Sequence, residues 1–335
     1  MSEVRKECRV CGSVGPHRTI TVREMYYGTR ELFDYYICKD CETLQIVDVL
    51  EGEELARHYP RKYYSYTVAE QPGLFQWMTT QRDRYELNER RQFVGALVAA
   101  LPPGVRSLIG TRDASGDVIK MLGDLNLARD ARILDVGCGG GTLLDRLARA
   151  GFTELTGADP FIDEDGVTPL GVPLLKRFMN EVTGEFDLIM FNHSLEHVPD
   201  PVETLKAANE RLAPGGVCLA RLPTTSSEAW TTYGKHWCLI DAPRHTVIPS
   251  RRGMELAAET VGLRVEKTID DSNSSQFFGS EAYRRGIALP ELNGLGAIFR
   301  NFGVRQMLGW ERRSVSLNRQ GRGDQAGFVM RAASA

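Results

Sequence analysis

The 335-residue sequence lacks any hydrophobic run long enough to span a bilayer, and it lacks a strong excess of charge of either sign. Its opening residues, MSEVRKECRV, carry charges where a signal peptide requires an apolar stretch. The net charge of −3 provides no general field that would attract a polyanion. These absences predict a cytoplasmic protein without a membrane span, and they argue against nucleic acid as its partner.

Cysteine is also scarce, with seven residues in the chain, an odd number that does not suit a framework of disulfides. Four of the seven form two close pairs, Cys8/Cys11 and Cys38/Cys41, and the β-prone stretch between them reads as a hairpin with Gly28 in or near its turn. Two C-x-x-C knuckles held by a hairpin are typical of a zinc ribbon, in which four thiolates surround Zn²⁺ and leave no position for water. The sequence therefore predicts a structural zinc ion bound by these four cysteines.

The chain divides by pattern into three parts. Residues 1–66 contain the cysteine pairs, and residues 67–131 form a helical linker or cap in which 73–101 show continuous helical spacing. In residues 132–335, short apolar strands alternate with helices, which is typical of an α/β fold with a doubly wound, mainly parallel sheet. A long insertion at 270–325 precedes the last expected strand, and we expect it to serve substrate binding or to carry its own helices.

A glycine-rich turn follows a buried strand in the segment Ile133–Gly141, ILDVGCGGG. In open α/β sheets, ligands bind at the carboxyl ends of the strands, and glycine lets the backbone approach them closely. Asp159, at the end of the next expected strand, is placed to accept hydrogen bonds from the hydroxyls of a ribose. The spacing is not the GxGxxG of a dinucleotide site, and the charge of Asp135 would oppose a pyrophosphate but attract an amino group. These features favour a nucleoside ligand that carries an ammonium and a sulfonium group.

The run D-V-G-C-G-x-G, followed one strand later by an acid, resembles motif I of class I S-adenosylmethionine-dependent methyltransferases, and FDLIMF, SLEHVPDP and LAPGGV follow in the order seen in that family. The resemblance implies a Rossmann-like domain with a seven-stranded sheet and S-adenosylmethionine as the methyl donor. It places Asp159 at the ribose, and Asn192 and His193 near the reactive methyl group. Along the methionine moiety it places Asp135, Gly137, Gly139 and Gly141.

Histidines supply the candidates for acid–base chemistry. His193, Glu196 and His197 spell H-x-x-E-H, which is also a zinc-peptidase signature, but the prolines that follow leave no long helix to carry both histidines on one face. We therefore expect a structural role for His197, whereas His193, directly after an apolar strand, is a candidate catalytic base. His245 is the second candidate, in a loop that starts at Tyr233. The alternative for this loop is structural, with an Asp–Arg pair and an aromatic anchor tying it down.

The zinc ribbon and the methyltransferase motifs together resemble bacterial methyltransferases of sugar and surface-glycan (polysaccharide) biosynthesis, and the segment Leu317–Gln325 fits that group. The expected reaction is methyl transfer to a sugar hydroxyl on a nucleotide sugar or a growing glycan. Sugar C-methylation and methylation of rRNA or tRNA by a zinc-ribbon enzyme remain alternatives, as does a non-catalytic scaffold. No motif decides the oligomeric state, and a homodimer is left open.

Overall fold

The computed structural model describes residues 2–59, 73–89, 91–101, 118–292 and 294–333, and contacts group them into two compact units. The first unit takes the described residues within Met1–Pro60, His193–Asn209 and Ala220–Ala335. The second takes those within Arg61–Asn192 and Glu210–Leu219. Each unit joins distant parts of the chain, so the division into 1–66, 67–131 and 132–335 stays a prediction about chain order. Among the described residues, no helix is long and apolar enough to cross a membrane.

One large sheet contains eight strands, namely β5 (Ile133–Val136), β6 (Leu155–Ala158), β7 (Gly166–Val167), β8 (Pro173–Leu175), β9 (Phe186–Asn192), β10 (Leu212–Pro223), β12 (Leu263–Asp270) and β13 (Gln325–Ala332). Their order is β12-β13-β10-β9-β5-β6-β8-β7. Strands β9, β5, β6 and β8 are parallel, whereas β7 pairs with β8 and β12 with β13 in the antiparallel sense. The expected mainly parallel α/β sheet is confirmed, with eight strands rather than seven because the two-residue strand β7 extends one edge.

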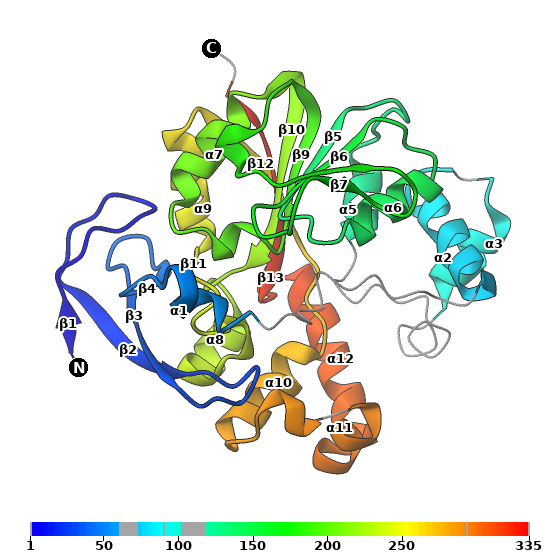
Figure 1. Cartoon of the computed structure of the whole chain (residues 1–335). Helices are drawn as coiled ribbons and strands as arrows, with labels where there is room; N and C mark the ends of the chain where they lie inside the picture. The colour runs from blue at the N-terminus through cyan, green and yellow to red at the C-terminus, as the bar shows by residue number, and fades with distance from the viewer. Residues whose placement is uncertain (1, 60–72, 90, 102–117, 293, 334–335) are drawn as a thin grey trace. The chain divides into compact units, whose positions relative to one another are not determined.

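The core of the second unit is formed by β5, β6 and β9, which lie side by side in Figure 1. All four residues of β5, ILDV, are buried, as a parallel strand covered on both faces requires. Helix α6 (Thr142–Arg149) follows β5 directly and buries Leu144 and Leu147 completely. In the parallel register, Val136 of β5 lies opposite both Ala158 of β6 and Phe191 of β9. The residues that follow these three positions therefore leave the sheet at the same edge.

Two helices precede this core where the sequence predicts one. The continuous helix expected over 73–101 is wrong, because the chain forms α2 (Gly73–Glu86) and α3 (Phe93–Ala100). Asn88 lies between them with a φ of 70°, a left-handed conformation that cannot continue a right-handed helix. Gly95 lets the backbones approach, since a Cβ there would lie 2.1 Å from the carbonyl oxygen of Gln81. A further short helix, α5 (Val118–Asp124), buries five of its seven residues.

The first unit contains a separate antiparallel sheet of five strands in the order β1-β2-β3-β4-β11. The hairpin of β2 and β3 is the one expected between the cysteine pairs, and Gly28 lies in its connection with a φ of 79°. The last strand, β11, pairs with β4, so a segment about two hundred residues further along the chain completes the N-terminal sheet. The strands are β1 (Glu3–Val4), β2 (His17–Arg23), β3 (Leu32–Ile37), β4 (Leu44–Ile46) and β11 (Val247–Ile248).

The remaining helices of the first unit include three in the insertion at 270–325, which therefore carries its own helices. Side chains cap two of these helices: Asp200 Oδ1 accepts from the backbone N–H of Glu203, and Ser250 Oγ accepts from that of Gly253. The helices are α1 (Gly52–Ala56), α7 (Pro201–Asn209), α8 (Glu228–Tyr233), α9 (Arg251–Thr260), α10 (Ser275–Arg284), α11 (Gly294–Phe302) and α12 (Val304–Arg319).

Candidate functional site

The glycine turn after β5 has the backbone that only glycine adopts easily. Gly137, Gly139 and Gly141 have φ values of 75°, 54° and 74°. The N–H of Gly137 donates to the carbonyl of Ala158 at 2.7 Å, which ties the turn to the end of β6. At Gly141 a Cβ would lie 2.4 Å from Thr168 Cγ2, so a side chain has no room there. The turn is thus fixed by its own packing before any ligand is considered.

Two carboxylates, Asp135 and Asp159, are buried beside this turn. Asp159 accepts hydrogen bonds from the backbone N–H groups of Gly139 at 2.9 Å and Phe161 at 2.8 Å. The Asp135 carboxylate receives no hydrogen bond from the described part of the chain, and it is 3% exposed. Burial, with a smaller effect from the charge of Asp159, raises the pKa of Asp135 to about 8. No cationic side chain among the described residues pairs with these two acids, and a cationic ligand would supply the positive charge.

Asn192 and His193 mark the end of β9. Asn192 is the last residue of the strand and belongs to the second unit, together with Asp135 and Asp159. His193 is the first residue of its segment of the first unit and has a φ of 56°. A non-glycine residue in this conformation stores backbone strain, which proteins retain mainly at functional positions.

His193 is held by two hydrogen bonds. Its backbone N–H donates to the carbonyl of Arg221 at 2.8 Å, and its ring Nδ1 lies 3.3 Å from Oε1 of the fully buried Glu196. Burial lowers the pKa of His193, so the ring is neutral at physiological pH. With Nδ1–H directed at the carboxylate, Nε2 carries the lone pair that a base requires. The described contacts therefore give His193 the geometry of an oriented base.

The loop that contains His245 is tied down as the structural alternative predicted. Arg244 is fully buried and pairs with Glu24 at 3.2 Å and with both oxygens of Asp241. The aromatic anchor is Trp237, whose Nε1–H donates to Asp324 at 3.0 Å. The Nδ1 of His245 is bonded to the carbonyl of Leu239 at 2.8 Å, and its Nε2 faces carboxylate oxygens of Asp241 at 3.8 Å and Glu196 at 3.9 Å. A catalytic role for His245 stays a prediction.

The four predicted zinc ligands come together in the first unit. One ligand atom from each of Cys8, Cys11, Cys38 and Cys41 lies within 4.8 Å of the others. The Sγ atoms of Cys8 and Cys41 are 3.6 Å apart, as are those of Cys11 and Cys38. Sulfurs about 2.3 Å from a tetrahedral ion are separated by about 3.8 Å, so the spacing fits Zn²⁺. The amide of Gln45 donates to Cys8 Sγ at 3.0 Å, as expected of a group that supports a thiolate.

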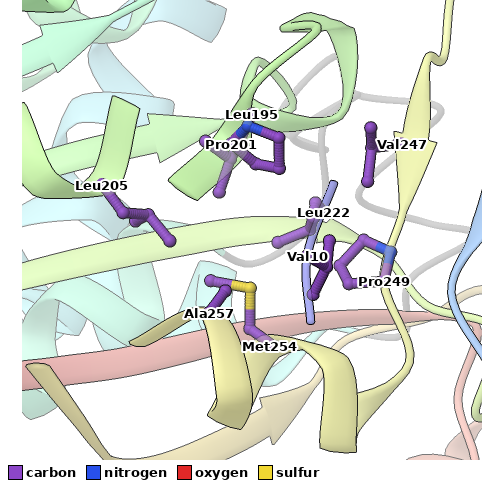
Figure 2. A pocket seen from close by; sticks show the side chains of 9 residues that line it. All are labelled: Val10, Leu195, Pro201, Leu205, Leu222, Val247, Pro249, Met254 and Ala257. Carbon is purple, nitrogen blue, oxygen red and sulfur yellow. The ribbon is translucent and has the colours of Figure 1, made fainter. Parts of the chain in front are cut away.

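A small cavity in the first unit is apolar and unsuited to a substrate. Figure 2 shows its lining side chains, which point at one another from both the N-terminal ribbon and the later helices. It measures about 10 Å³, no more than the space of one water molecule. This packing fixes Leu195, and with it the 3₁₀ turn Leu195–His197. The lining residues are Val10, Leu195, Pro201, Leu205, Leu222, Val247, Pro249, Met254 and Ala257.

Sequence reasoning missed the importance of Glu196 and Glu24. Glu196 enters the sequence analysis only as part of the H-x-x-E-H run, yet it is fully buried and its Oε2 has no hydrogen-bond partner among the residues that the structure describes. Glu24 lies 220 residues from Arg244 and is equally buried. No spacing rule connects residues so distant, although a glutamate within a β-prone stretch is a weak signal of a buried partner.

The glycine turn between β5 and α6 and the acid after β6 belong to a class I methyltransferase fold. A family model described as "Methyltransferase domain" matches residues 96–268, about half of the chain, and the chain belongs to that family.

Named relatives match over a smaller region. The ubiquinone biosynthesis O-methyltransferase of Aromatoleum aromaticum is 36% identical over 141 residues, 38% of this chain and 60% of that protein. The enzyme of the same name from Pseudomonas aeruginosa is 33% identical over 160 residues, 41% of this chain and 66% of that protein. This chain thus spans less than two thirds of the length of either relative.

Solved structures of similar fold have low sequence identity. The mycolic acid cyclopropane synthase CmaA1, in complex with SAH and CTAB, aligns with a TM-score of 0.42 and 17% identity over 64% of this chain and 84% of that one. An S-adenosylmethionine-dependent methyltransferase from Clostridium acetobutylicum aligns with a TM-score of 0.39 and 11% identity over 68% of this chain and 96% of that one.

Proposed function

We propose that the edge of the sheet formed by β5, β6 and β9 binds S-adenosylmethionine. The observation that carries this proposal is the buried pair of acids, of which Asp135 has no hydrogen bond from the described residues. The ammonium and sulfonium groups of the cofactor supply the missing positive charge, and Asp159 keeps lone pairs for the ribose hydroxyls. Asn192 and the glycines Gly137, Gly139 and Gly141 complete the proposed cofactor-binding set.

The proposed reaction moves the methyl group to a hydroxyl oxygen of a small molecule. A lone pair of the acceptor oxygen forms a bond to the methyl carbon as the carbon–sulfur bond breaks, and the sulfur leaves as a neutral thioether. The hydroxyl proton passes to Nε2 of His193, which Glu196 orients through Nδ1 at 3.3 Å. Most of the remaining task is to hold oxygen, carbon and sulfur in line.

The acceptor we propose is a sugar hydroxyl, on a nucleotide sugar or a glycan. The resemblance of the motifs and the cysteine ribbon to sugar methyltransferases supports this class. The relatives are named as O-methyltransferases, which supports oxygen as the accepting atom, while their place in ubiquinone biosynthesis offers a second acceptor class. A sugar carbon and RNA are the alternative acceptors, and methyl transfer to either would contradict the proposed sugar hydroxyl.

We also propose that Cys8, Cys11, Cys38 and Cys41 hold a structural Zn²⁺. The sulfur separations and the thiolate-supporting contact from Gln45 support the assignment. Four cysteines leave no open coordination position, so this ion would stabilise the ribbon sheet and take no part in methyl transfer.

The test is a transfer assay with S-adenosylmethionine labelled in the methyl group. The acceptors are nucleotide sugars, hydroxylated ubiquinone precursors and bulk RNA, and Asp135→Asn serves as the inactive control. We expect label in an alkali-stable methyl ether of a nucleotide sugar. Label in RNA or on a sugar carbon would overturn the proposed acceptor, and label in the ubiquinone precursors alone would shift it to the second class.

A further inference from the structure

Three metal-ligating side chains outside the cysteine cluster converge in the first unit. Glu196 and His197 lie in the 3₁₀ turn Leu195–His197, and His245 follows the buried Arg244. One ligand atom of each lies within 4.8 Å of the other two. The Nε2 of His245 is 3.9 Å from Oε1 of Glu196, and the rings of the two histidines are 4.7 Å apart. Two of these side chains, Glu196 and His197, are adjacent in one turn, whereas His245 comes from a separate segment more than 47 residues further along the chain.

Both imidazoles are oriented as metal ligands are. The Nδ1 of His245 lies 2.8 Å from the carbonyl oxygen of Leu239, and the Nδ1 of His197 lies 3.0 Å from that of Arg244. A carbonyl only accepts, so each Nδ1 carries the proton and each Nε2 carries a lone pair; the Tyr59 hydroxyl, 3.0 Å from the same Nδ1 of His197, then also accepts from it. Bonding of the second ring nitrogen to a backbone carbonyl is the usual support of a metal-bound histidine.

The carboxylate of the group has an oxygen that nothing satisfies. Glu196 is fully buried, and its Oε2 has no hydrogen-bond partner among the described residues, while Oε1 faces Nδ1 of His193. A buried, unpaired carboxylate oxygen costs a few kcal/mol, which a bound cation would recover. The turn is also held in place, since the N–H of Thr246 donates to the carbonyl of Glu196 at 2.8 Å. The turn that carries the unsatisfied oxygen is therefore held in place by the backbone.

The charges of the cluster leave room for a divalent cation. Its carboxylates are Glu24, Asp241 and Glu196, and its one guanidinium is that of Arg244. Asp241 also faces the site, with Oδ2 3.8 Å from Nε2 of His245. Because Glu24 and Asp241 already share Arg244, Glu196 is the carboxylate of the group that has no guanidinium partner among the described residues.

We propose that Glu196, His197 and His245 bind a divalent transition-metal ion such as Zn²⁺. Ligands about 2.1 Å from a tetrahedral ion lie about 3.4 Å apart. His245 Nε2 and Glu196 Oε1 are 3.9 Å apart and the whole group lies within 4.8 Å, so binding requires the side chains to close by up to about 1.4 Å. Two imidazoles and a carboxylate select Zn²⁺ or a neighbouring first-row ion over Mg²⁺ and Ca²⁺. Three protein ligands leave one position open for an oxygen ligand. His245 is then a ligand, and His193 is left as the base.

The test is a Co²⁺ titration of the metal-free full-length chain, without cofactor or acceptor. Cobalt bound by four cysteines shows intense thiolate-to-metal charge transfer, whereas cobalt bound by nitrogen and oxygen shows only weak visible bands. We expect two equivalents in the wild type, the second without a gain in charge transfer. Because methyl transfer is not measured, this outcome is independent of the proposed reaction.

Variants separate the proposed site from incidental binding. His197→Ala and Glu196→Gln should each weaken the second equivalent at least tenfold and leave the cysteine-bound equivalent, which also reports that the ribbon is folded. His236→Ala, a histidine outside the group, should keep both equivalents. A wild type with only the cysteine-bound equivalent, or a second equivalent that survives both ligand variants, would overturn the proposal.

Discussion

Two regions of this molecule bury carboxylates, and they differ in what neutralises them. In the first unit, Glu24 and Asp241 share the buried guanidinium of Arg244. In the second unit, Asp135 and Asp159 have no cationic partner among the described residues, burial raises the pKa of both, and the charge of Asp159 raises that of Asp135 further. The first arrangement is complete within the chain and serves the fold, whereas the second is incomplete until a cation arrives. The difference shows that a buried charge indicates a ligand site only where the chain leaves it unpaired.

The four cysteines are also incomplete without a cation, the proposed Zn²⁺. Removal of this ion gives the largest expected effect on the free energy of unfolding. We expect Cys38→Ser to lose the bound Zn²⁺ and to lower the free energy of unfolding by about 5 kcal/mol or more. An isolated zinc-finger peptide loses roughly 10–16 kcal/mol, but here β4 also pairs with β11. Denaturant unfolding and metal analysis give the result, and Cys138→Ser, outside the cluster, should keep its zinc. If the Cys38→Ser variant lost its zinc but kept the stability of the wild type, the cysteine cluster would not need a cation, and the comparison with Asp135 and Asp159 would fail.

Breaking the complete arrangement should be the next largest effect. Arg244→Met leaves the carboxylates of Glu24 and Asp241 buried without their cation, and we expect a loss of about 3–5 kcal/mol in the free energy of unfolding. Arg252→Met removes an arginine that is 57% exposed and pairs with surface glutamates, and it should cost less than about 1 kcal/mol. Equal losses in the two variants would show that burial does not distinguish these ion pairs.

The incomplete acid pair should behave in the opposite way. Asp135→Asn removes a carboxylate that has no described partner, so the ligand-free protein should be at least as stable as the wild type. Its affinity for S-adenosylmethionine should fall about 10- to 100-fold. This corresponds to the loss of a hydrogen bond to a charged group, which contributes about 1.5–3 kcal/mol. Calorimetry measures the affinity, and Asp163→Asn, an exposed acid of the same unit, is the matched control. A large loss of stability with unchanged affinity would assign Asp135 to the fold.

The smallest effect compares the two cysteine knuckles. Gly12 follows Cys11 with a φ of 70°, and Glu42 follows Cys41 with a φ of 57°. The same left-handed turn is thus made by glycine in one knuckle and by a strained residue in the other. We expect Glu42→Gly to raise the free energy of unfolding by about 0.5–1 kcal/mol and Gly12→Ala to lower it by about 1 kcal/mol. Shifts of the same sign in denaturant titrations would contradict this.

Much of the fold, and the proposed cofactor site at the ends of β5, β6 and β9, could be predicted because the sequence patterns that indicate them are local. The strand ILDV, the glycine turn and the acid one strand later lie within 27 residues (133–159), and each follows a periodicity or a turn requirement. The knuckles are equally local. The break between α2 and α3 was missed because both sides keep helical spacing and only the backbone of Asn88 departs from it.

The cluster around Arg244 could not be predicted in the same way. Glu24, Glu196 and Arg244 come from three distant segments, and only the folded chain shows that they share one buried region. Likewise, the strand that completes the ribbon sheet, β11, is two residues long and carries no signal of its own. The sequence indicated an Asp–Arg pair, but neither its third member, Glu24, nor the histidines that lie beside it.

The central claim is that the buried carboxyl of Asp135, which has no hydrogen bond or cation among the described residues, binds the cationic cofactor. Its pKa of about 8 means that the carboxyl holds a proton in most molecules at pH 7, and a bound cation should expel that proton. The most direct measurement is calorimetry of S-adenosylmethionine binding at pH 7 in two buffers of different ionisation enthalpy. The wild type should release close to one proton more than Asp135→Asn. Equal proton release by the two proteins would contradict the claim.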